Sequence, residues 1–301
     1  MKCFILIWSF PLFILGSAEL QVSTSSAANS VSVFQYRVPS GYDSSRPGTW
    51  RVLVLFGGRN TDGKAEASGR LGWGEWADEN GIFLLCPGFR NDNYWEPQKW
   101  SGKALISALH QLSRKYRICT DHILYYGYSA GSQASNLFAA WRPRICRAWV
   151  SHACGYFHRP HAGLAGLPGL VTCGDVDRER YVISRRFVRA AQRAGERIIL
   201  RSFPHRNHEI PPESLVLARA FLKFYHVFYM SDLEALPQNG KKEVRKAVRQ
   251  VPTLYIGDDL DGTYYPVGSK RIRGILMEDR VPLPSKAVAD AWGEAEGESA
   301  P

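Results

Sequence analysis

Short runs of consecutive apolar residues recur along most of the chain, and amphipathic segments separate them. Runs of about four to eight apolar residues that end at Gly or Pro are typical of strands buried on both faces of a sheet. The run at 51–56 ends at Gly57, and the run at 82–86 ends at Pro87. By the same criterion, strands are predicted at 51–56, 82–86, 123–126, 147–151, 170–173 and 197–203.

The segments between these strands carry apolar residues at helical spacing. Leu105, Leu109 and Leu112 form such a stripe, which predicts a helix with one apolar face. Helices are predicted at 73–79, 102–116, 130–141 and 212–229, and a further helix carries the arginines that follow residue 177. Strands that alternate with helices predict an α/β fold with a mostly parallel central sheet and helices on both faces.

The two ends of the chain depart from this alternating pattern. Residues 19–30 are rich in Ser and Ala without periodicity, which predicts a flexible lead-in. Near the other end, Asp261-Gly262 is a hairpin turn signal between two short β-rich runs. The predicted organisation is therefore a lead-in at 19–30, an α/β domain at 31–229 and a C-terminal extension with short strands at 230–301.

The first 18 residues have the pattern of a secretory signal peptide. Lys2 precedes an apolar run from Phe4 to Leu15, and the small residues Gly16-Ser17-Ala18 follow. The run is shorter than the about 20 apolar residues that cross a bilayer, although an uncleaved anchor is the alternative. We therefore expect a secreted or periplasmic protein with no membrane span after signal cleavage.

The formal net charge of +10 changes this picture little. Arg185, Arg189, Arg193 and Arg197 recur every four residues, the spacing of one solvated helix face. The basic run at 241–246 has the same interpretation, and an anionic polymer or cell-surface partner is the alternative. No nucleic-acid-binding motif accompanies the charge, so we expect no nucleic-acid partner.

The cysteines number six, and signal cleavage would remove Cys3. An odd number would then remain, so at least one cysteine cannot pair within the chain. Export permits disulfides, but their connectivity does not follow from one sequence.

The strongest chemical signal is the pentapeptide Gly127-Tyr128-Ser129-Ala130-Gly131, between a predicted strand and a predicted helix. A serine hydroxyl is a weak nucleophile unless it is exposed, next to a base and close to a charge-stabilising site. A sharp strand-to-helix turn provides the exposure, and it needs glycines where a side chain would collide with neighbouring backbone. The motif therefore predicts that Ser129 is a nucleophile.

Enzymes with a serine on such a turn have the chain order nucleophile, acid, base. The acid should follow the predicted strand at 170–173, where Asp177 is the preferred candidate and Asp175 the alternative. The base should follow the strand at 197–203, where His208 is preferred over His205 because it lies in the middle of the loop. The unused aspartate is expected to cap the next helix.

Attack on a carbonyl creates an oxyanion, which backbone N–H groups fixed in advance can stabilise. One donor should be Ala130, which follows the nucleophile. The other should come from the loop after the strand at 51–56, at Gly58 or Arg59, where Gly57-Gly58 allows close approach of the backbone.

Together these segments resemble the α/β-hydrolase superfamily, and within it the secreted esterases that include feruloyl and acetylxylan esterases and polyhydroxybutyrate depolymerases. The resemblance covers residues 31–229 and departs at Phe56-Gly57, where that family usually has His-Gly. It is carried by Tyr36–Tyr42, Val52–Gly58, Trp76–Ile82 and the segments around Ser129, Asp177 and His208.

The resemblance implies ester hydrolysis through an acyl-enzyme, with no cofactor and with a small-molecule or polymer-linked ester as substrate. A serine peptidase of the prolyl-oligopeptidase kind is an alternative, although such enzymes carry a large N-terminal propeller and only roughly 30 residues precede the fold here. A non-catalytic binding protein with the same fold is a third hypothesis. The oligomeric state does not follow from the sequence.

Aromatic residues on predicted loops are candidates for substrate binding. Tyr128 adjoins the nucleophile, and Trp95 and Trp100 follow a predicted core strand on the edge where such folds bind ligands. Their alternative role is to cover the core. The spacings His158/His161 and His205/His208 lack the pattern of a zinc site, so no metal is expected.

Overall fold

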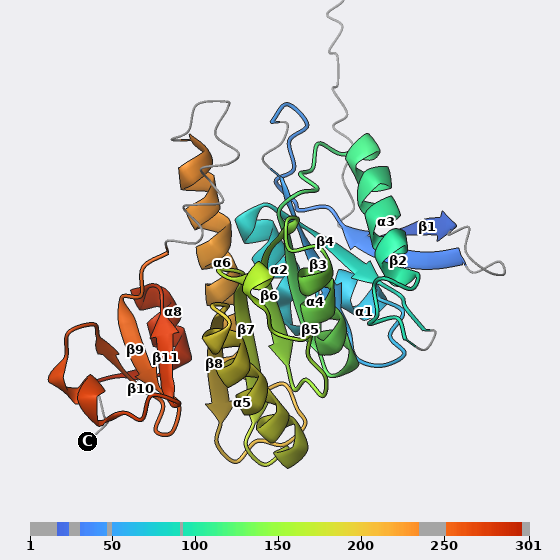
Figure 1. Cartoon of the computed structure of the whole chain (residues 1–301). Coiled ribbons are helices and arrows are strands. Elements are labelled where there is room, and N and C mark those ends of the chain that lie inside the picture. The colour runs from blue at the N-terminus through green and yellow to red at the C-terminus, as the bar shows by residue number, and fades with distance from the viewer. Residues whose placement is uncertain (1–16, 24–30, 47–49, 91–92, 235–250, 297–301) are drawn as a thin grey trace, which may run out of the picture.

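The computed structural model describes residues 17–23, 31–46, 50–90, 93–234 and 251–296 (Figure 1). Nearly all of the predicted signal peptide and the whole basic run at 241–246 lie outside these described residues. Among the described residues, the helices are too short or too polar to cross a bilayer.

The central sheet is built from β1 (Ala18–Ser23), β2 (Val31–Arg37), β3 (Arg51–Phe56), β4 (Ile82–Pro87), β5 (Ile123–Tyr128), β6 (Cys146–His152), β7 (Pro168–Gly174) and β8 (Arg197–Phe203). Its spatial order is β1-β2-β4-β3-β5-β6-β7-β8. β1 and β2 pair antiparallel, whereas the strands from β4 to β8 in this order run parallel. The carboxyl ends of β3, β5, β7 and β8 therefore meet at one edge.

The helical elements of the α/β domain are α1 (Lys64–Ala67), η1 (Arg70–Gly72), α2 (Trp73–Asn80), α3 (Ser101–Lys115), α4 (Ala130–Trp141), η2 (Ala162–Leu164), α5 (Arg178–Arg193) and α6 (Pro212–Glu234). Helices α3, α4 and α5 lie on one face of the sheet, and α2 and α6 lie on the other (Figure 1). The predicted α/β fold with helices on both faces is confirmed. Strands β3 and β8 and helix α4 have the predicted bounds.

Neighbouring residues of β5 pack into the hydrophobic layers on opposite faces of the sheet. Tyr125 packs against Phe138 of α4, with ring centroids 6.5 Å apart. Tyr126, the next residue, packs against Trp73 of α2 at 4.7 Å. Alternate side chains of a strand point to opposite faces, so a continuous apolar run is needed where both faces are covered.

The prediction of a flexible lead-in at 19–30 is wrong for its first part. Residues 18–23 form β1, which pairs with β2, and the rest of the lead-in lies outside the described residues. Val22 is buried, and the Gln35 amide donates a hydrogen bond of 2.9 Å to the Glu19 carboxylate. The Ser- and Ala-rich composition concealed a strand that needs the edge of β2 as its partner.

The C-terminal extension is more regular than predicted. It contains β9 (Tyr255–Asp258), β10 (Thr263–Pro266), η3 (Lys270–Gly274), β11 (Arg280–Leu283), α8 (Lys286–Trp292) and β12 (Glu294–Ala295). Its strands form a second sheet in the order β11-β9-β10-β12, and the predicted hairpin is β9–β10. The Trp292 indole donates a hydrogen bond of 2.6 Å to the Leu200 carbonyl of β8 and so ties the extension to the main domain.

The predicted arginine stripe is not a simple solvated face. Arg197 begins β8 and does not belong to helix α5. Arg185 is largely buried and forms ion pairs with Asp259 and Asp279 of the extension, the first at 3.0 Å. Arg189 pairs with Glu278 at 3.3 Å near the surface. The extension therefore covers part of the helix face that the spacing assigned to solvent.

Candidate active site

Ser129 lies on a sharp turn between β5 and α4. Its backbone has φ 54° and ψ −119°, a conformation that non-glycine residues rarely adopt. The turn is held because the Ser129 amide donates to the His152 carbonyl at 3.0 Å, and the Ser132 amide donates to the Ser129 carbonyl at 3.0 Å. A strained turn fixed in this way raises the serine side chain above the carboxyl edge of the sheet.

The two glycines of the motif are required by close backbone approach. A Cβ atom on Gly127 would lie 2.0 Å from the carbonyl oxygen of Gly131. A Cβ atom on Gly131 would lie 2.2 Å from the carbonyl oxygens of Phe56 and Gly57. The start of α4 is therefore pressed both onto its own strand and onto the end of β3.

The structure brings the three predicted triad residues together. The Nε2 atom of His208 lies 2.9 Å from Ser129 Oγ, and its Nδ1 atom lies 2.8 Å from Asp177 Oδ2. A carboxylate only accepts hydrogen bonds, so Nδ1 donates to Asp177 and Nε2 is left to accept the Ser129 proton. This is the tautomer that a general base at Nε2 requires.

Asp177 occupies the position predicted for the acid, and the hydrogen bonds of the His208 ring go to Asp177 and Ser129. Asp177 is buried, and its second carboxylate oxygen accepts a hydrogen bond of 3.0 Å from Arg180. Asp177 also stands at the N-cap position of α5, but its side chain makes no capping bond. The expectation that Asp175 caps this helix is therefore wrong, because Asp177 holds the position and turns its carboxylate to the histidine.

The loop that carries His208 is held by two residues, His152 and Tyr128, to which the sequence analysis gave no such role. The Nε2 atom of His152 lies 2.6 Å from the Glu209 carbonyl, which can only accept, and its Nδ1 atom lies 2.6 Å from Thr172 Oγ1. Burial lowers the pKa of His152 to about 4, so its ring stays neutral near pH 7. A histidine at the end of the strand next to β5 was the only signal in the sequence.

Tyr128 is the second of these residues. Its hydroxyl donates a hydrogen bond of 3.1 Å to the His208 carbonyl, and its ring stacks on the His208 ring with centroids 5.3 Å apart. Tyr128 had been expected to contact substrate. It lines a pocket and at the same time positions the histidine.

The predicted oxyanion donors lie on two adjacent segments. Ala130 begins α4, and the first N–H groups of a helix have no partner within that helix. Phe56 is opposite Gly127 in the β3–β5 ladder, which brings Gly58 beside the serine turn. Arg59 follows in the same loop. Phe56, where the similar family usually has His, is buried and packs on Phe138 at 5.0 Å.

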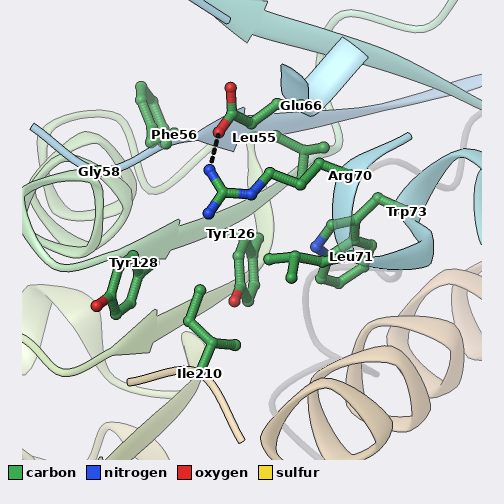
Figure 2. Close-up of a pocket in the computed structure, with 11 residues that line it drawn as sticks. Leu55, Phe56, Gly58, Glu66, Arg70, Leu71, Trp73, Tyr126, Tyr128 and Ile210 are labelled. Carbon is green, nitrogen blue, oxygen red and sulfur yellow. Dashed lines mark ion pairs between the residues drawn. The ribbon is translucent and has the colours of Figure 1, made fainter. Parts of the chain in front are cut away.

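A pocket of roughly 450 Å³ opens beside this loop (Figure 2). Gly58 and Tyr128 line the side next to the serine turn, and Ile210 comes from the histidine loop. The walls are mainly apolar, but two charged residues also line the pocket. They are Arg70 and Glu66, which form an ion pair of 3.7 Å. The remaining lining residues are Leu55, Phe56, Gly57, Leu71, Trp73 and Tyr126.

The other predicted substrate contacts lie elsewhere. Trp100 packs against Phe89 at 5.1 Å and lines a separate polar hollow near β1 and β2, and Trp95 packs against Tyr94 at 5.2 Å. Neither tryptophan lines the pocket beside Tyr128. Both rings pack on neighbouring aromatic side chains, and their predicted contact with substrate stays a prediction.

Three of the four histidines at HxxH spacing bond to other groups of the chain. His158 Nε2 lies 2.9 Å from Glu196, and His161 accepts a hydrogen bond from the Gly163 amide. His208 is engaged by Asp177 and Ser129. Among the described residues, no group of three or more His, Cys, Asp or Glu side chains is placed to hold a metal ion.

No family model matches the sequence, and no curated protein matches it. Solved structures do resemble the fold. A thermostable esterase matches at 18% identity and TM-score 0.53, over 62% of this chain and 54% of that one. A ferulic acid esterase from Anaeromyces mucronatus matches at 14% identity and TM-score 0.54, over 70% of this chain and 91% of that one.

A protein described as a dipeptidyl aminopeptidase IV from Bacteroides ovatus also matches, at 13% identity and TM-score 0.56. The match covers 70% of this chain and 36% of that chain. This chain thus spans about half of the thermostable esterase and about a third of the aminopeptidase. At these identities the comparisons establish the fold.

Proposed function

We propose that this chain, which has the α/β-hydrolase fold, is a serine hydrolase that cleaves carboxylic esters. The observation that carries the proposal is the unbroken hydrogen-bonded series from Ser129 through His208 to Asp177. The esterases among the similar structures support the same reaction class.

In the proposed reaction, His208 Nε2 takes the proton of Ser129 Oγ as that oxygen bonds to the substrate carbonyl carbon. The C–O bond to the alcohol then breaks, and the proton passes from His208 to the departing alkoxide. A water molecule next gives its proton to His208 while its oxygen attacks the acyl carbon. The Ser129–acyl bond breaks, and the serine recovers the proton from His208.

The surroundings of the triad have separate tasks in this scheme. The N–H groups of Ala130 and of Gly58 or Arg59 stabilise the oxyanion, because donors fixed in advance need no reorganisation during the reaction. Asp177 holds the Nδ1–H tautomer and balances the imidazolium charge. The Arg180 guanidinium fixes the second oxygen of Asp177 and so limits rotation of the carboxylate.

Hydrolysis of a short-chain p-nitrophenyl ester tests the proposal. We expect Ser129→Ala to lower kcat by about 10⁶-fold, as for other serine hydrolases that lose the nucleophile. Ser113→Ala, on the exposed face of α3, is the matched control and should have the wild-type rate. Equal rates for wild type and Ser129→Ala would remove the proposed nucleophile.

Two histidine variants test which residue is the general base. His208→Gln should lose nearly all activity, because the glutamine side chain cannot accept and return the serine proton. His205→Gln changes an exposed histidine three residues earlier in the same loop and should retain activity. The opposite order of activities would transfer the base to His205.

Two further assays separate the other hypotheses. A fluorophosphonate probe should label the wild type at Ser129, whereas a non-catalytic binding protein would not react. Dipeptidyl amide substrates should be cleaved far more slowly than the esters. Faster cleavage of the amides would indicate a peptidase of the prolyl-oligopeptidase kind.

We further propose that the protein is exported and that residues 1–18 are removed. The apolar run between Lys2 and the small residues at 16–18 is the basis of this proposal. N-terminal sequencing of the protein from culture medium or periplasm should begin at Glu19. Protein that stays in the cytoplasm with Met1 intact would contradict it.

A further inference from the structure

Three hydrogen-bond donors without a partner lie at or behind the inner wall of the pocket. They are Trp73 Nε1, Tyr126 Oη and Arg219 Nε, and each atom is buried with no hydrogen-bond partner among the described residues. Trp73 is only 2% exposed and Tyr126 only 5%, so solvent does not replace the missing bonds. A buried donor without a partner costs about 1–3 kcal/mol, so three in one place call for an explanation.

The three donors belong to one cluster, although their elements are far apart in the sequence. The Trp73 and Tyr126 rings lie 4.7 Å apart, and the Arg219 guanidinium lies 5.4 Å from the Trp73 ring. Trp73 and Tyr126 line the pocket, and in Figure 2 the Leu71 side chain is drawn between them. Arg219 stands behind Trp73, where its Nη2 donates to the Leu71 carbonyl.

The cluster offers donors and positive charge. Indole N–H and guanidinium groups only donate, and a tyrosine hydroxyl donates as long as it is protonated. Burial raises the pKa of Tyr126, which keeps that proton in place at neutral pH. Arg219 and Arg70 both act electrostatically on Tyr126, and Arg70 is held at the pocket by Glu66. The complementary ligand group is an oxygen acceptor with negative charge.

The pocket also has a defined relation to the proposed reaction. Gly58, one of the proposed oxyanion donors, and Tyr128, which precedes the nucleophile, line its opposite side. An acyl group whose carbonyl lies at the oxyanion loop can therefore extend between the apolar walls toward Tyr126. The pocket is open to solvent and its interior is small, so we expect it to take only a short chain with a small terminal group.

We propose that this pocket is the acyl-binding site for esters of short dicarboxylic acids, with Tyr126 and Trp73 donating to the distal carboxylate. Arg219 and Arg70 supply the favourable charge. The proposal rests on the proposed esterase function and adds a substrate class to it. It also explains why donors without partners persist in an otherwise apolar wall.

Three p-nitrophenyl esters that differ only at the end of the acyl chain provide the test. They are the glutarate hemiester with a free carboxylate, its neutral methyl ester and the hexanoate. We expect kcat/KM for the hemiester to exceed that for the methyl ester by about tenfold, since hydrogen bonds to charged groups are the stronger ones. The preference should fall with added salt, because the guanidinium charges contribute to it.

Tyr126→Phe removes one hydroxyl and keeps the ring. It should reduce the preference for the hemiester about tenfold, mainly through a higher KM, because the contact exists before the reaction begins. Trp73→Phe should act in the same direction. Tyr125→Phe is the matched control, since Tyr125 is the neighbouring residue on the opposite face of β5 and should leave the preference unchanged.

Inhibition by free glutarate gives a second readout that does not require turnover of the hemiester. With the methyl ester as substrate, glutarate should compete with the wild type and should compete about tenfold less well with Tyr126→Phe. A neutral analogue of similar length, hexanamide, should inhibit both proteins equally and weakly.

The outcomes distinguish the two proposals. If none of the three esters is hydrolysed, the esterase function itself fails. If the neutral esters are hydrolysed as fast as the hemiester or faster, only the acyl-site proposal is overturned. Equal loss on all three substrates in Tyr126→Phe would also overturn it, because the hydroxyl would then support the fold or a trapped water molecule.

Discussion

Two regions of this molecule each bring together a basic side chain, a carboxylate and a hydroxyl group. The basic side chain of one region is partly exposed to solvent, and that of the other is largely buried. At the carboxyl edge of the sheet, the His208 side chain remains 32% exposed beside Ser129 and Asp177. At the junction with the extension, Arg185 is 13% exposed, and its partners Asp259 and Asp279 are 1% and 3% exposed. The first cluster can admit a substrate, whereas the second is closed.

The two clusters also differ in how their polar atoms are used. At the junction, Asp259 accepts hydrogen bonds from the Ser202 amide and hydroxyl as well as from Arg185, which is the full satisfaction that burial demands. At the edge, the serine stands on a strained turn and the histidine loop is held by Tyr128 and His152. Similar side chains thus stabilise the fold in one place and have the arrangement that the proposed reaction needs in the other.

The largest effect that tests this contrast is expected at the acid. Asp177→Asn should lower kcat by about 10⁴-fold, because an amide can donate to Nδ1 and so favours the wrong tautomer of His208. Thermal unfolding should change far less than activity. The measurements are steady-state hydrolysis of a p-nitrophenyl ester and a melting curve.

Asp175→Asn is the matched control for this variant. Asp175 lies two residues earlier in the same loop, and the hydrogen bonds of the His208 ring go to Asp177 and Ser129, so the Asp175 variant should keep most of the activity. If Asp175→Asn were the inactive protein and Asp177→Asn the active one, the roles of the two aspartates would be exchanged.

The second prediction concerns the junction with the extension, where we expect a substitution to lower the free energy of unfolding. Arg185→Ala leaves two buried carboxylates without their cation, and removal of one partner of a buried ion pair costs about 3–5 kcal/mol. Urea unfolding should therefore show a large loss of stability, with little change in kcat at a temperature where the variant is folded.

Arg189→Ala is the control at the surface of the same helix. Its pair with Glu278 is exposed, and such pairs contribute about 0–1 kcal/mol. Equal destabilisation by the two variants would mean that the extension is not held through the buried arginine.

The sequence predicted features that depend on neighbours in the chain. The run at 51–56 is β3, and the motif around Ser129 is a turn between strand and helix, because both patterns are local. The order of Ser129, Asp177 and His208 was also predictable, since parallel strands bring their carboxyl ends to one edge.

Features that depend on distant partners were missed. Arg185 meets carboxylates 74 and 94 residues away, so its spacing along α5 indicated only a helix. Strand β1 needed β2, and His152 needed the Glu209 carbonyl 57 residues further on. The tryptophans at 95 and 100 pack on aromatic rings and Trp100 also lines a hollow, so their predicted contact with substrate stays a prediction.

His152 lies beside the candidate active site but resembles the junction residues, because it is buried and both of its ring nitrogens are hydrogen-bonded. Its folded pKa is lowered to about 4 by burial, against 6.5 for an ordinary histidine. Between these values the unfolded chain binds more protons, so stability is full above about pH 6.5 and is lost as pH falls toward 4. The expected loss is roughly 3 kcal/mol, at about 1.4 kcal/mol for each pKa unit.

Urea unfolding at a series of pH values measures this loss, and two variants separate its sources. His226 is partly buried, and desolvation lowers its pKa to about 4, so it contributes in the same pH range and His226→Gln removes its share. His152→Gln keeps a donor for the Glu209 carbonyl but cannot titrate, and it should flatten the remaining dependence. An unchanged slope in both variants would contradict the assignment.

The smallest expected effect is that of the Tyr128 hydroxyl. Tyr128→Phe removes the 3.1 Å hydrogen bond to the His208 carbonyl but leaves the ring that stacks on the imidazole. A hydrogen bond of this kind contributes about 1 kcal/mol, so kcat should fall roughly fivefold. Tyr128→Leu removes the stacking as well and should cost more. If Tyr128→Phe changed KM alone, the hydroxyl would act on substrate, and its proposed role in positioning His208 would be contradicted.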